Sequence, residues 1–159
     1  MDYRTRPISQ RQDRGNNRSD TGQEAAQKVF AAWERWDLQA VESFMADSAI
    51  DSRPQSGEHF VGRPNIMAMY HEVPGPPKIT WRSVRGGPKV WVGEGIVEYG
   101  EGPVHIVGIV EFADGKITMA DYYFAEPFDP PASRSRWAAQ TKRAEAGEVH
   151  IDTAPLLQG

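Results

Sequence analysis

Apolar residues first recur at helical spacing shortly after residue 20. Apolar side chains at intervals of three or four residues predict a helix over 22–35. These residues are Ala25, Val29, Ala32, Trp33 and Trp36. Asp20 or Thr21 is expected to cap the start of this helix. Asp37 is expected to cap a second, shorter helix, whose apolar stripe consists of Leu38, Val41, Phe44 and Met45. The two segments together predict a helical hairpin.

The pattern farther along the chain is mostly extended. Residues 49–53 predict a short strand that Pro54 ends, and residues 59–61 predict a second one. Pro64 favours the start of a third helix, which should end before the proline and glycine residues at 73–77. Alternating residues then predict four strands, at 78–84, 89–99, 104–112 and 116–124. This order predicts an α+β fold in which helices cover one face of an antiparallel sheet.

Charge is distributed unevenly over the 159 residues. The net charge is −4, but residues 21–131 carry sixteen acidic against nine basic side chains, a net −7. An acidic body argues against nucleic acid as a partner, because phosphate contacts need clustered Lys and Arg. Residues 1–20 are expected to form a disordered basic arm, and residues 132–159 an extension that is weakly helical around 136–146. A single domain, residues 21–131, is expected between them.

Composition excludes several further classes of protein. The chain contains no Cys, which rules out disulfides, thiol nucleophiles and thiolate metal sites. Its four His are scattered, without the spacing that indicates a metal site. No apolar run approaches the roughly 20 residues that a membrane span needs, and the polar start does not predict a secretory signal. We therefore expect a cytoplasmic protein with no membrane partner, metal or cofactor, in which any chemistry rests on carboxylate, Arg, His or Tyr.

Several segments in a fixed order carry a family resemblance. Asp37-Leu38 between two helices, then MADSAIDSRP, then FVGRPNIMAMY and a meander holding EFADGKI resemble the nuclear transport factor 2-like superfamily, over about 21–128. Within it, the chain looks most like the ketosteroid-isomerase-like and SnoaL-like polyketide-cyclase branch. The resemblance implies a cone-shaped roll, in which a helical hairpin and a third helix pack on a strongly bent antiparallel sheet around one deep, mostly apolar pocket. Activity is not implied, since this fold hosts isomerases, cyclases, dehydratases, epoxide hydrolases and binding domains.

The functional residues of the isomerases do not carry over to this chain. Arg53 stands where the resemblance places their carboxylate base, Gly108 where it places an acidic donor, and Val29 where it places a Tyr. These differences argue against steroid isomerase activity. Asp51 lies two residues before Arg53 and should share its face of the strand. Arg53 could therefore bind a carboxylate, enolate or phenolate oxygen while paired to Asp51, or it could extend into water from the end of the strand.

The last predicted strand holds two candidates for acid/base chemistry. The resemblance to SnoaL-like cyclases implies an Asp on this strand, and counting from Asp114-Gly115 places Tyr122 there, with Asp121 beside it. Asp121 would match only if this count from the turn were shifted by one residue. Such a shift also places the side chain on the opposite face of the strand. The alternative for Asp121 is an exposed carboxylate at the strand edge.

Glu94 is a further candidate whose position depends on strand register. If the strands on either side of the 100–103 turn pair with Glu98 opposite Val104, Glu94 lies opposite Gly108. A carboxylate beside that small residue would suit a general base with a raised pKa. In the alternative register, Glu94 and Glu98 point into solvent, and the pocket face carries Trp91, Val97 and Tyr99.

These candidates lead to two hypotheses about function. The pocket is expected to be lined by Trp33, Tyr70, Ile106, Gly108 and Val110. The leading hypothesis is a protein that takes a small, apolar, cyclic or polyketide-like molecule and performs cofactor-free acid/base chemistry of isomerase, cyclase or dehydratase type. The alternative is a non-catalytic ligand-binding or dimerisation module. Apolar residues of both parities at 104–112 favour a homodimer through the sheet face, and sedimentation as a monomer would contradict it.

Overall fold

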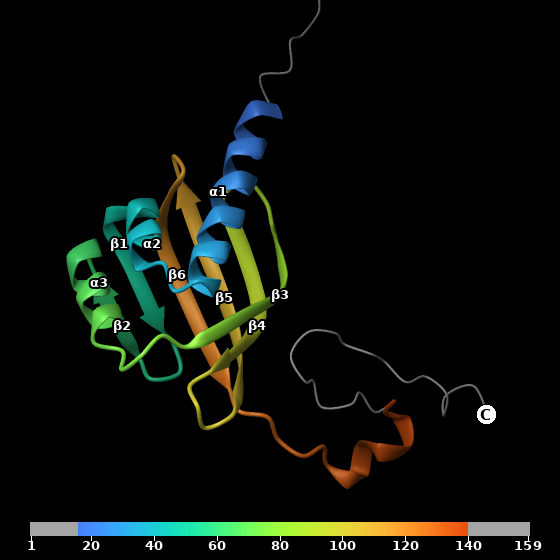
Figure 1. Cartoon of the computed structure of the whole chain (residues 1–159). Coiled ribbons are helices and arrows are strands. Elements are labelled where there is room, and N and C mark those ends of the chain that lie inside the picture. Colours follow the sequence, from blue (N-terminus) through green and yellow to red (C-terminus); the bar gives the residue numbers. More distant parts are fainter. Residues whose placement is uncertain (1–15, 140–159) are drawn as a thin grey trace, which may run out of the picture.

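A bent six-stranded sheet with helices against its concave face makes up the described part of the chain (Figure 1). The computed structural model describes residues 16–139, with side chains from residue 22 onward. The strand order is β2-β1-β6-β5-β4-β3. The elements, in chain order, are α1 (Asn16–Glu34), α2 (Leu38–Phe44), β1 (Met45–Arg53), β2 (Glu58–Val61), α3 (Arg63–His71), β3 (Lys78–Gly86), β4 (Val90–Glu98), β5 (Pro103–Ala113), β6 (Lys116–Ala125) and the 3-10 helix η1 (Ala132–Trp137).

The first helix begins six residues earlier than the apolar pattern predicts. Because α1 starts at Asn16, Asp20 and Thr21 lie inside the helix rather than at its cap, and residues 16–20 are helical rather than disordered. Apolar spacing marks the part of a helix that packs on a core, so the polar residues before it carry no such signal. The rest of the expected basic arm and the helical pattern at 140–146 lie outside the described residues, and the domain limits remain predictions.

The predicted helical hairpin is present, and its second helix is capped as expected. The Asp37 carboxylate accepts a hydrogen bond from the backbone N–H of Ala40 at 3.0 Å. Trp36 makes the preceding turn with a positive φ of 52°. Val41, on the inward side of α2, is fully buried. Across the described residues, no helix is both long and apolar enough to cross a membrane.

The sheet is mixed, whereas the sequence predicted an antiparallel one. Strands β3 to β6 form the predicted antiparallel meander, and β2 pairs antiparallel with β1. However, β1 pairs in parallel with β6, with Ile50 opposite Met119 and Ser52 opposite Asp121. Parallel neighbours need a long connection, and here the connection contains β2, α3 and the first three strands of the meander.

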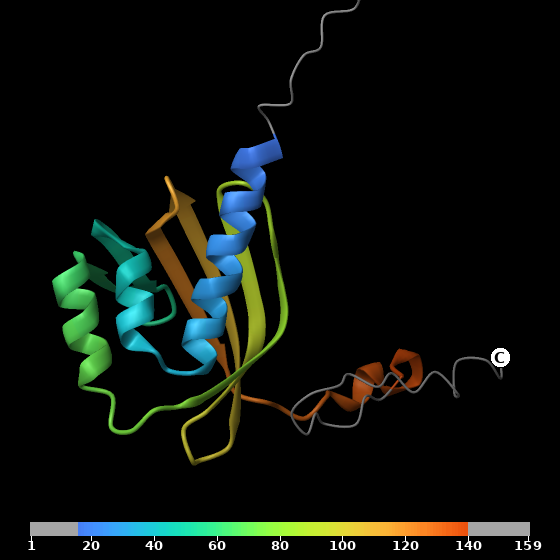
Figure 2. The same cartoon turned by 45° about the horizontal axis from the view of Figure 1, so that its top comes forward.

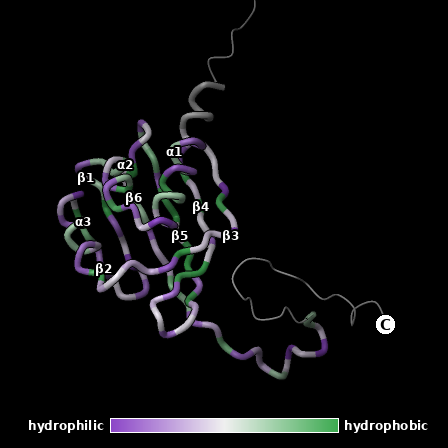
Figure 3. The backbone as a smooth tube through the Cα atoms, in the orientation of Figure 1, coloured by the Kyte–Doolittle hydropathy of each residue, from purple (hydrophilic) through white to green (hydrophobic). Residues whose placement is uncertain are grey.

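The core lies between α1 and the concave face of the sheet (Figure 2). Phe30 of α1 fits over Gly93, where a Cβ atom would stand only 2.2 Å from the ring. Phe30 also meets Trp81 of β3 edge-on, with ring centroids 4.9 Å apart. Hydrophobic stretches concentrate in the central strands around β4 and β5 (Figure 3).

The opposite face of the sheet is also partly apolar. On β5, Ile106 and Val110 are buried toward the core, while Val107 and Ile109 lie half-buried on the other face. A homodimer through this face remains a prediction.

Candidate ligand pocket

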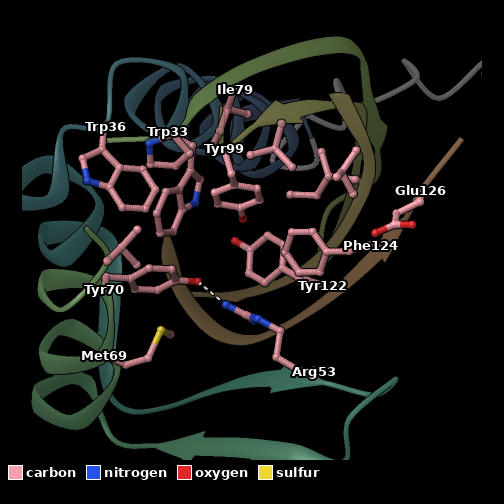
Figure 4. A pocket seen from close by; sticks show the side chains of 15 residues that line it. Trp33, Trp36, Arg53, Met69, Tyr70, Ile79, Tyr99, Tyr122, Phe124 and Glu126 are labelled. Carbon is pink, nitrogen blue, oxygen red and sulfur yellow. Dashed lines mark hydrogen bonds between the residues drawn. The ribbon is translucent and has the colours of Figure 1, made fainter. Parts of the chain in front are cut away.

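A cavity of about 500 Å³ opens beside the core, between the end of α1, α3 and the concave face of the sheet (Figure 4). Its walls are mostly aromatic and aliphatic, which is typical of small-molecule sites. Its lining residues are Trp33, Trp36, Arg53, Met69, Tyr70, Val73, Pro77, Ile79, Val97, Tyr99, Val104, Ile106, Tyr122, Phe124 and Glu126.

Arg53, Asp51 and Tyr70 form a closed hydrogen-bonded group at one side of this cavity. Arg53 Nη1 donates to Asp51 Oδ1 and, at 3.1 Å, to the Ser52 carbonyl. Arg53 Nη2 donates to the Tyr70 hydroxyl at 2.9 Å, and that hydroxyl donates to Asp51 Oδ2 at 2.5 Å. Three of the five guanidinium N–H donors are thus used among the described residues. The remaining two have no hydrogen-bond partner among the described residues.

Four aromatic rings surround the Arg53 guanidinium. Its central carbon lies 4.9 Å from the ring centroid of Tyr122 and 5.8 to 5.9 Å from those of Tyr70, Phe124 and Phe60. Arg prefers such faces because its planar cation is attracted to the negative ring face. The rings therefore add to the hydrogen bonds in fixing the guanidinium at the cavity wall.

The fold positions this group through strand alternation and one side-chain clamp. Asp51 and Arg53 share a face of β1 because they are two residues apart. Beyond the end of β1, the Gln55 amide exchanges two hydrogen bonds with the backbone of Phe124, at 2.5 and 2.6 Å. Gln55 thereby ties the turn after Arg53 to β6. Tyr70 reaches Asp51 from the buried side of α3.

Arg53 also lines a second hollow, likewise of about 500 Å³. It shares Arg53, Met69, Tyr122 and Phe124 with the first cavity. The walls that belong to it alone are more polar and consist of Gln55, Ser56, Glu58 and Phe60. Arg53 therefore lines both an aromatic cavity and a more polar annex.

Burial dominates the electrostatics of the site. It raises the pKa of Asp51, although Arg53 and Tyr70 both favour the carboxylate and so reduce the rise. It also raises the pKa of Tyr70, Tyr99 and Tyr122, so these hydroxyls stay protonated at neutral pH. Arg is protonated throughout the physiological range. At neutral pH the cavity therefore presents hydrogen-bond donors.

The raised pKa of Asp51 predicts how stability depends on pH. Folded protein holds the Asp51 proton more tightly than unfolded chain does, so this group stabilises most below its unfolded pKa. That contribution is lost as the pH rises through the folded pKa. The unfolding free energy of the wild type, measured relative to Asp51→Asn, should therefore fall between about pH 4 and the folded pKa, by at most about 1.4 kcal/mol per pH unit. Urea denaturation of both proteins across this range tests it, and a rise would contradict it.

Most of the predicted site residues meet at this cavity. Arg53, Trp33, Tyr70, Ile106 and Tyr122 line it. Asp51 lies behind Arg53 and Tyr70, with 1% of its surface exposed, and reaches the cavity only through them.

Two predicted pocket residues belong to the core instead. Gly108 is covered by the ring of Tyr122, which would lie 2.8 Å from a Cβ atom there. Val110 is fully buried in the hydrophobic core. Both share the inward face of β5 with Ile106, but other side chains fill the space over them.

Glu94 and Asp121 do not join the group. In the observed register Glu98 faces Pro103 and Glu94 faces Val107, so the register that would place Glu94 opposite Gly108 is wrong. The Glu94 side chain is 49% exposed and pairs with Arg85 at 3.2 Å. Asp121 lies beside Tyr122 on β6 and so points to the other face of the strand. Its charge still adds to the rise in the Asp51 pKa.

Sequence reasoning missed several residues of the cavity wall. Phe124 and Glu126 both lie at the end of β6, where the alternation pattern stops. Phe124 could have been found, because it lies two residues after Tyr122 on the same face of β6. Tyr99 was expected on the pocket face only in the alternative register of β4, together with Val97, and both residues line the cavity. No group of three or more potential metal-ligating side chains occurs in the described part of the chain.

The curled, unclosed sheet and the helix within it define a nuclear transport factor 2-like, ketosteroid-isomerase-like fold. A family model, the SnoaL-like domain, matches residues 26–120, and the chain belongs to this family. The resemblance drawn from the sequence is thereby confirmed. A comparison with curated protein sequences gives no significant match.

Solved structures support the same fold. An NTF-2 like protein of unknown function from Burkholderia xenovorans LB400 is 33% identical, with 77% of this chain and 97% of that chain covered and a TM-score of 0.71. A putative ketosteroid isomerase from Kribbella flavida DSM 17836 is 19% identical, with 83% and 97% covered and a TM-score of 0.72. An LEH-like epoxide hydrolase of M. tuberculosis is 16% identical, with 67% and 84% covered and a TM-score of 0.56. The last two likenesses concern the fold alone.

Proposed function

We propose that this protein binds a small, flat, cyclic or polyketide-like molecule and holds an oxygen atom of that molecule against Arg53. The observation that carries the proposal is an aromatic cavity of about 500 Å³ with a fixed guanidinium in its wall. The volume is that of a drug-sized ligand site. The aromatic walls suit a flat ring, and the two remaining N–H donors of Arg53 suit an acceptor oxygen.

The polar groups of the cavity select the kind of oxygen. Among the described lining residues, Glu126 is the only carboxylate, and it is exposed at the rim. Arg53, Tyr99 and Tyr122, which also line it, are hydrogen-bond donors at neutral pH. A carboxylate or phenolate on the ligand would meet donors and a cation beside Arg53, whereas the one carboxylate that an ammonium group could meet among these lining residues, Glu126, is exposed. Ligands with an anionic oxygen should therefore bind best.

Acid/base chemistry of isomerase, cyclase or dehydratase type is a second candidate. It is favoured by Arg53 and Tyr122, which both line the cavity and are both protonated at neutral pH. Two donors at one place can stabilise negative charge that develops on an enolate oxygen. Such an activity would show as deuterium uptake from D₂O next to the carbonyl of 1-tetralone, followed by NMR. No uptake above the buffer rate would leave binding alone as the function.

Calorimetric titration tests the binding proposal with three bicyclic probes. We expect 2-naphthoate to bind more tightly than 2-naphthol, and 2-naphthylmethylammonium to bind least. Arg53→Lys keeps the charge but loses the planar set of donors, so it should weaken 2-naphthoate binding about tenfold. Arg85→Lys, an exposed residue of another ion pair, is the control and should leave binding unchanged. Equal binding of the three probes, or no binding, would contradict the proposal.

A further inference from the structure

The turn after α1 places a tryptophan in a backbone conformation that usually belongs to glycine. Trp36 has a φ of 52°, and its N–H donates to the Trp33 carbonyl at 3.0 Å. The N–H of Asp37 donates to the Ala32 carbonyl at 2.9 Å. These two bonds form the helix-ending pattern in which the residue after the cap is left-handed and most often glycine. A Cβ atom strains that conformation, so Trp36 costs the fold stability that a glycine would not.

The Trp36 side chain borders the aromatic cavity. It is half-buried, and its ring centroid lies 5.7 Å from that of Trp33 and 6.0 Å from that of Tyr70 (Figure 4). A half-buried ring gains less from packing in the fold than a fully buried one does. Strained residues in folded proteins cluster at ligand sites, where the strain belongs to the function. A strained residue whose ring borders a cavity therefore points to a role in binding.

Tyr70 links the position of Trp36 to that of Arg53. The centroid of its ring lies 6.0 Å from that of Trp36 and 5.8 Å from the central carbon of the Arg53 guanidinium. Trp36 and Arg53 line the same cavity, and in Figure 4 they lie on different sides of the Tyr70 ring. An acid bound at Arg53 therefore has to extend past Tyr70 to reach Trp36. A second fused ring gives a flat acid that additional length.

We propose that Trp36 is a specificity-determining residue, which stacks on the part of the ligand's ring system that lies farthest from Arg53. This rests on the proposed binding function and adds a size to its ligand class, an anionic oxygen on a flat system of at least two fused rings. Such a system gains apolar burial and offset stacking from the indole. A single-ring acid held at Arg53 leaves Trp36 uncovered and gains neither. Binding thereby uses a side chain that lowers the stability of the free protein.

Calorimetric titration with 2-naphthoate and benzoate tests the role of Trp36, because the two acids share the carboxylate and differ by one ring. The wild type should bind 2-naphthoate at least about tenfold more tightly than benzoate. Trp36→Ala should weaken 2-naphthoate binding about tenfold and benzoate binding by less than about twofold. Trp36→Phe retains a smaller ring and should keep part of the preference. Trp137→Ala is the control and should change neither affinity, since Trp137 is 64% exposed and does not line the cavity.

Thermal denaturation of Trp36→Gly and Trp36→Ala tests the strain at the turn. Both variants lack the ring, but only glycine relieves the positive φ. Trp36→Gly should therefore melt about 4 °C higher than Trp36→Ala. If Trp36→Gly melts no higher, the turn is not strained, and the reason for assigning Trp36 to the ligand is overturned.

The outcomes separate this inference from the proposed function. If Trp36→Ala weakens both acids equally or neither, or if the wild type does not prefer 2-naphthoate, the role of Trp36 is overturned. The proposed function then stands as long as 2-naphthoate binds and Arg53→Lys weakens it. If the wild type binds neither acid, both proposals fall. Nuclear Overhauser effects between the second ring of 2-naphthoate and the Trp36 indole of the wild type decide the question even if the variants do not fold, and their absence overturns the inference.

Discussion

Replacing Arg53 with Met is expected to lower the free energy of unfolding by about 3 to 5 kcal/mol. The change removes the cation that faces Asp51 and leaves that carboxylate, 1% exposed, without a counter-charge. Among residues 16–139, Tyr70 alone would then hydrogen-bond to it. Met preserves much of the length of the side chain, so the loss reports the charge more than the packing. Urea denaturation followed by tryptophan fluorescence measures it.

Two further variants show whether the buried pair is the cause. Asp51→Asn in the Arg53→Met background should recover part of the stability, because no buried charge remains unpaired; the double-mutant cycle gives the coupling. Arg85→Met breaks an ion pair that is largely exposed and should cost less than about 1 kcal/mol. The interpretation fails if Arg53→Met costs no more than Arg85→Met, or if the two changes at the site are simply additive.

The local features of the site could be predicted because they depend on spacing along one strand. Asp51 and Arg53 lie two residues apart, and period-two alternation places both on one face of any strand that contains them. The aromatic cluster around the pair could not be predicted in this way. Tyr70 comes from α3 and Phe124 from β6, and their approach to Arg53 depends on how distant elements pack.

Strand register was the point at which sequence reasoning could not decide. Residues 104–112 are apolar on both parities, so alternation alone does not show which face of β5 points inward. In the structure, Ile106 and Val110 pack inward, and Val97 of β4 pairs with Val104 of β5. Glu94 is then directed to the exposed face beside Arg85. The same ambiguity explains why Glu94 remained a candidate.

The order of helices and strands along the sequence did not indicate that β1 pairs in parallel with β6. Hairpins follow from short turns between neighbouring strands, as at Asp114-Gly115. The contact of β1 with β6 joins segments about seventy residues apart, so no short turn between neighbouring strands indicates it. It nevertheless matters for the site, because it brings Tyr122 beside Arg53.

Gly95→Ala should lower the free energy of unfolding by about 3 kcal/mol, a large effect for one methyl group. A Cβ atom at Gly95 would lie 2.3 Å from the carbonyl oxygen of Thr80 and 3.1 Å from the Cα atom of Trp81. These are backbone atoms of β3 next to its irregularity between Trp81 and Ser83, so relief requires moving the strand. A flexible side chain could have yielded at lower cost. Thermal and urea denaturation measure the loss.

Gly87→Ala is the matched control, because nothing lies within 4 Å of a Cβ atom there and no positive φ is required. It should change the unfolding free energy by no more than about 0.5 kcal/mol. A shift of β3 in Gly95→Ala would also displace Ile79, which lines the cavity, so the folded variant should bind 2-naphthoate less tightly than Gly87→Ala does. Equal stability of the two variants would mean that β3 yields easily at this point. The close approach of β3 to β4 could then not be what holds that wall of the cavity in place.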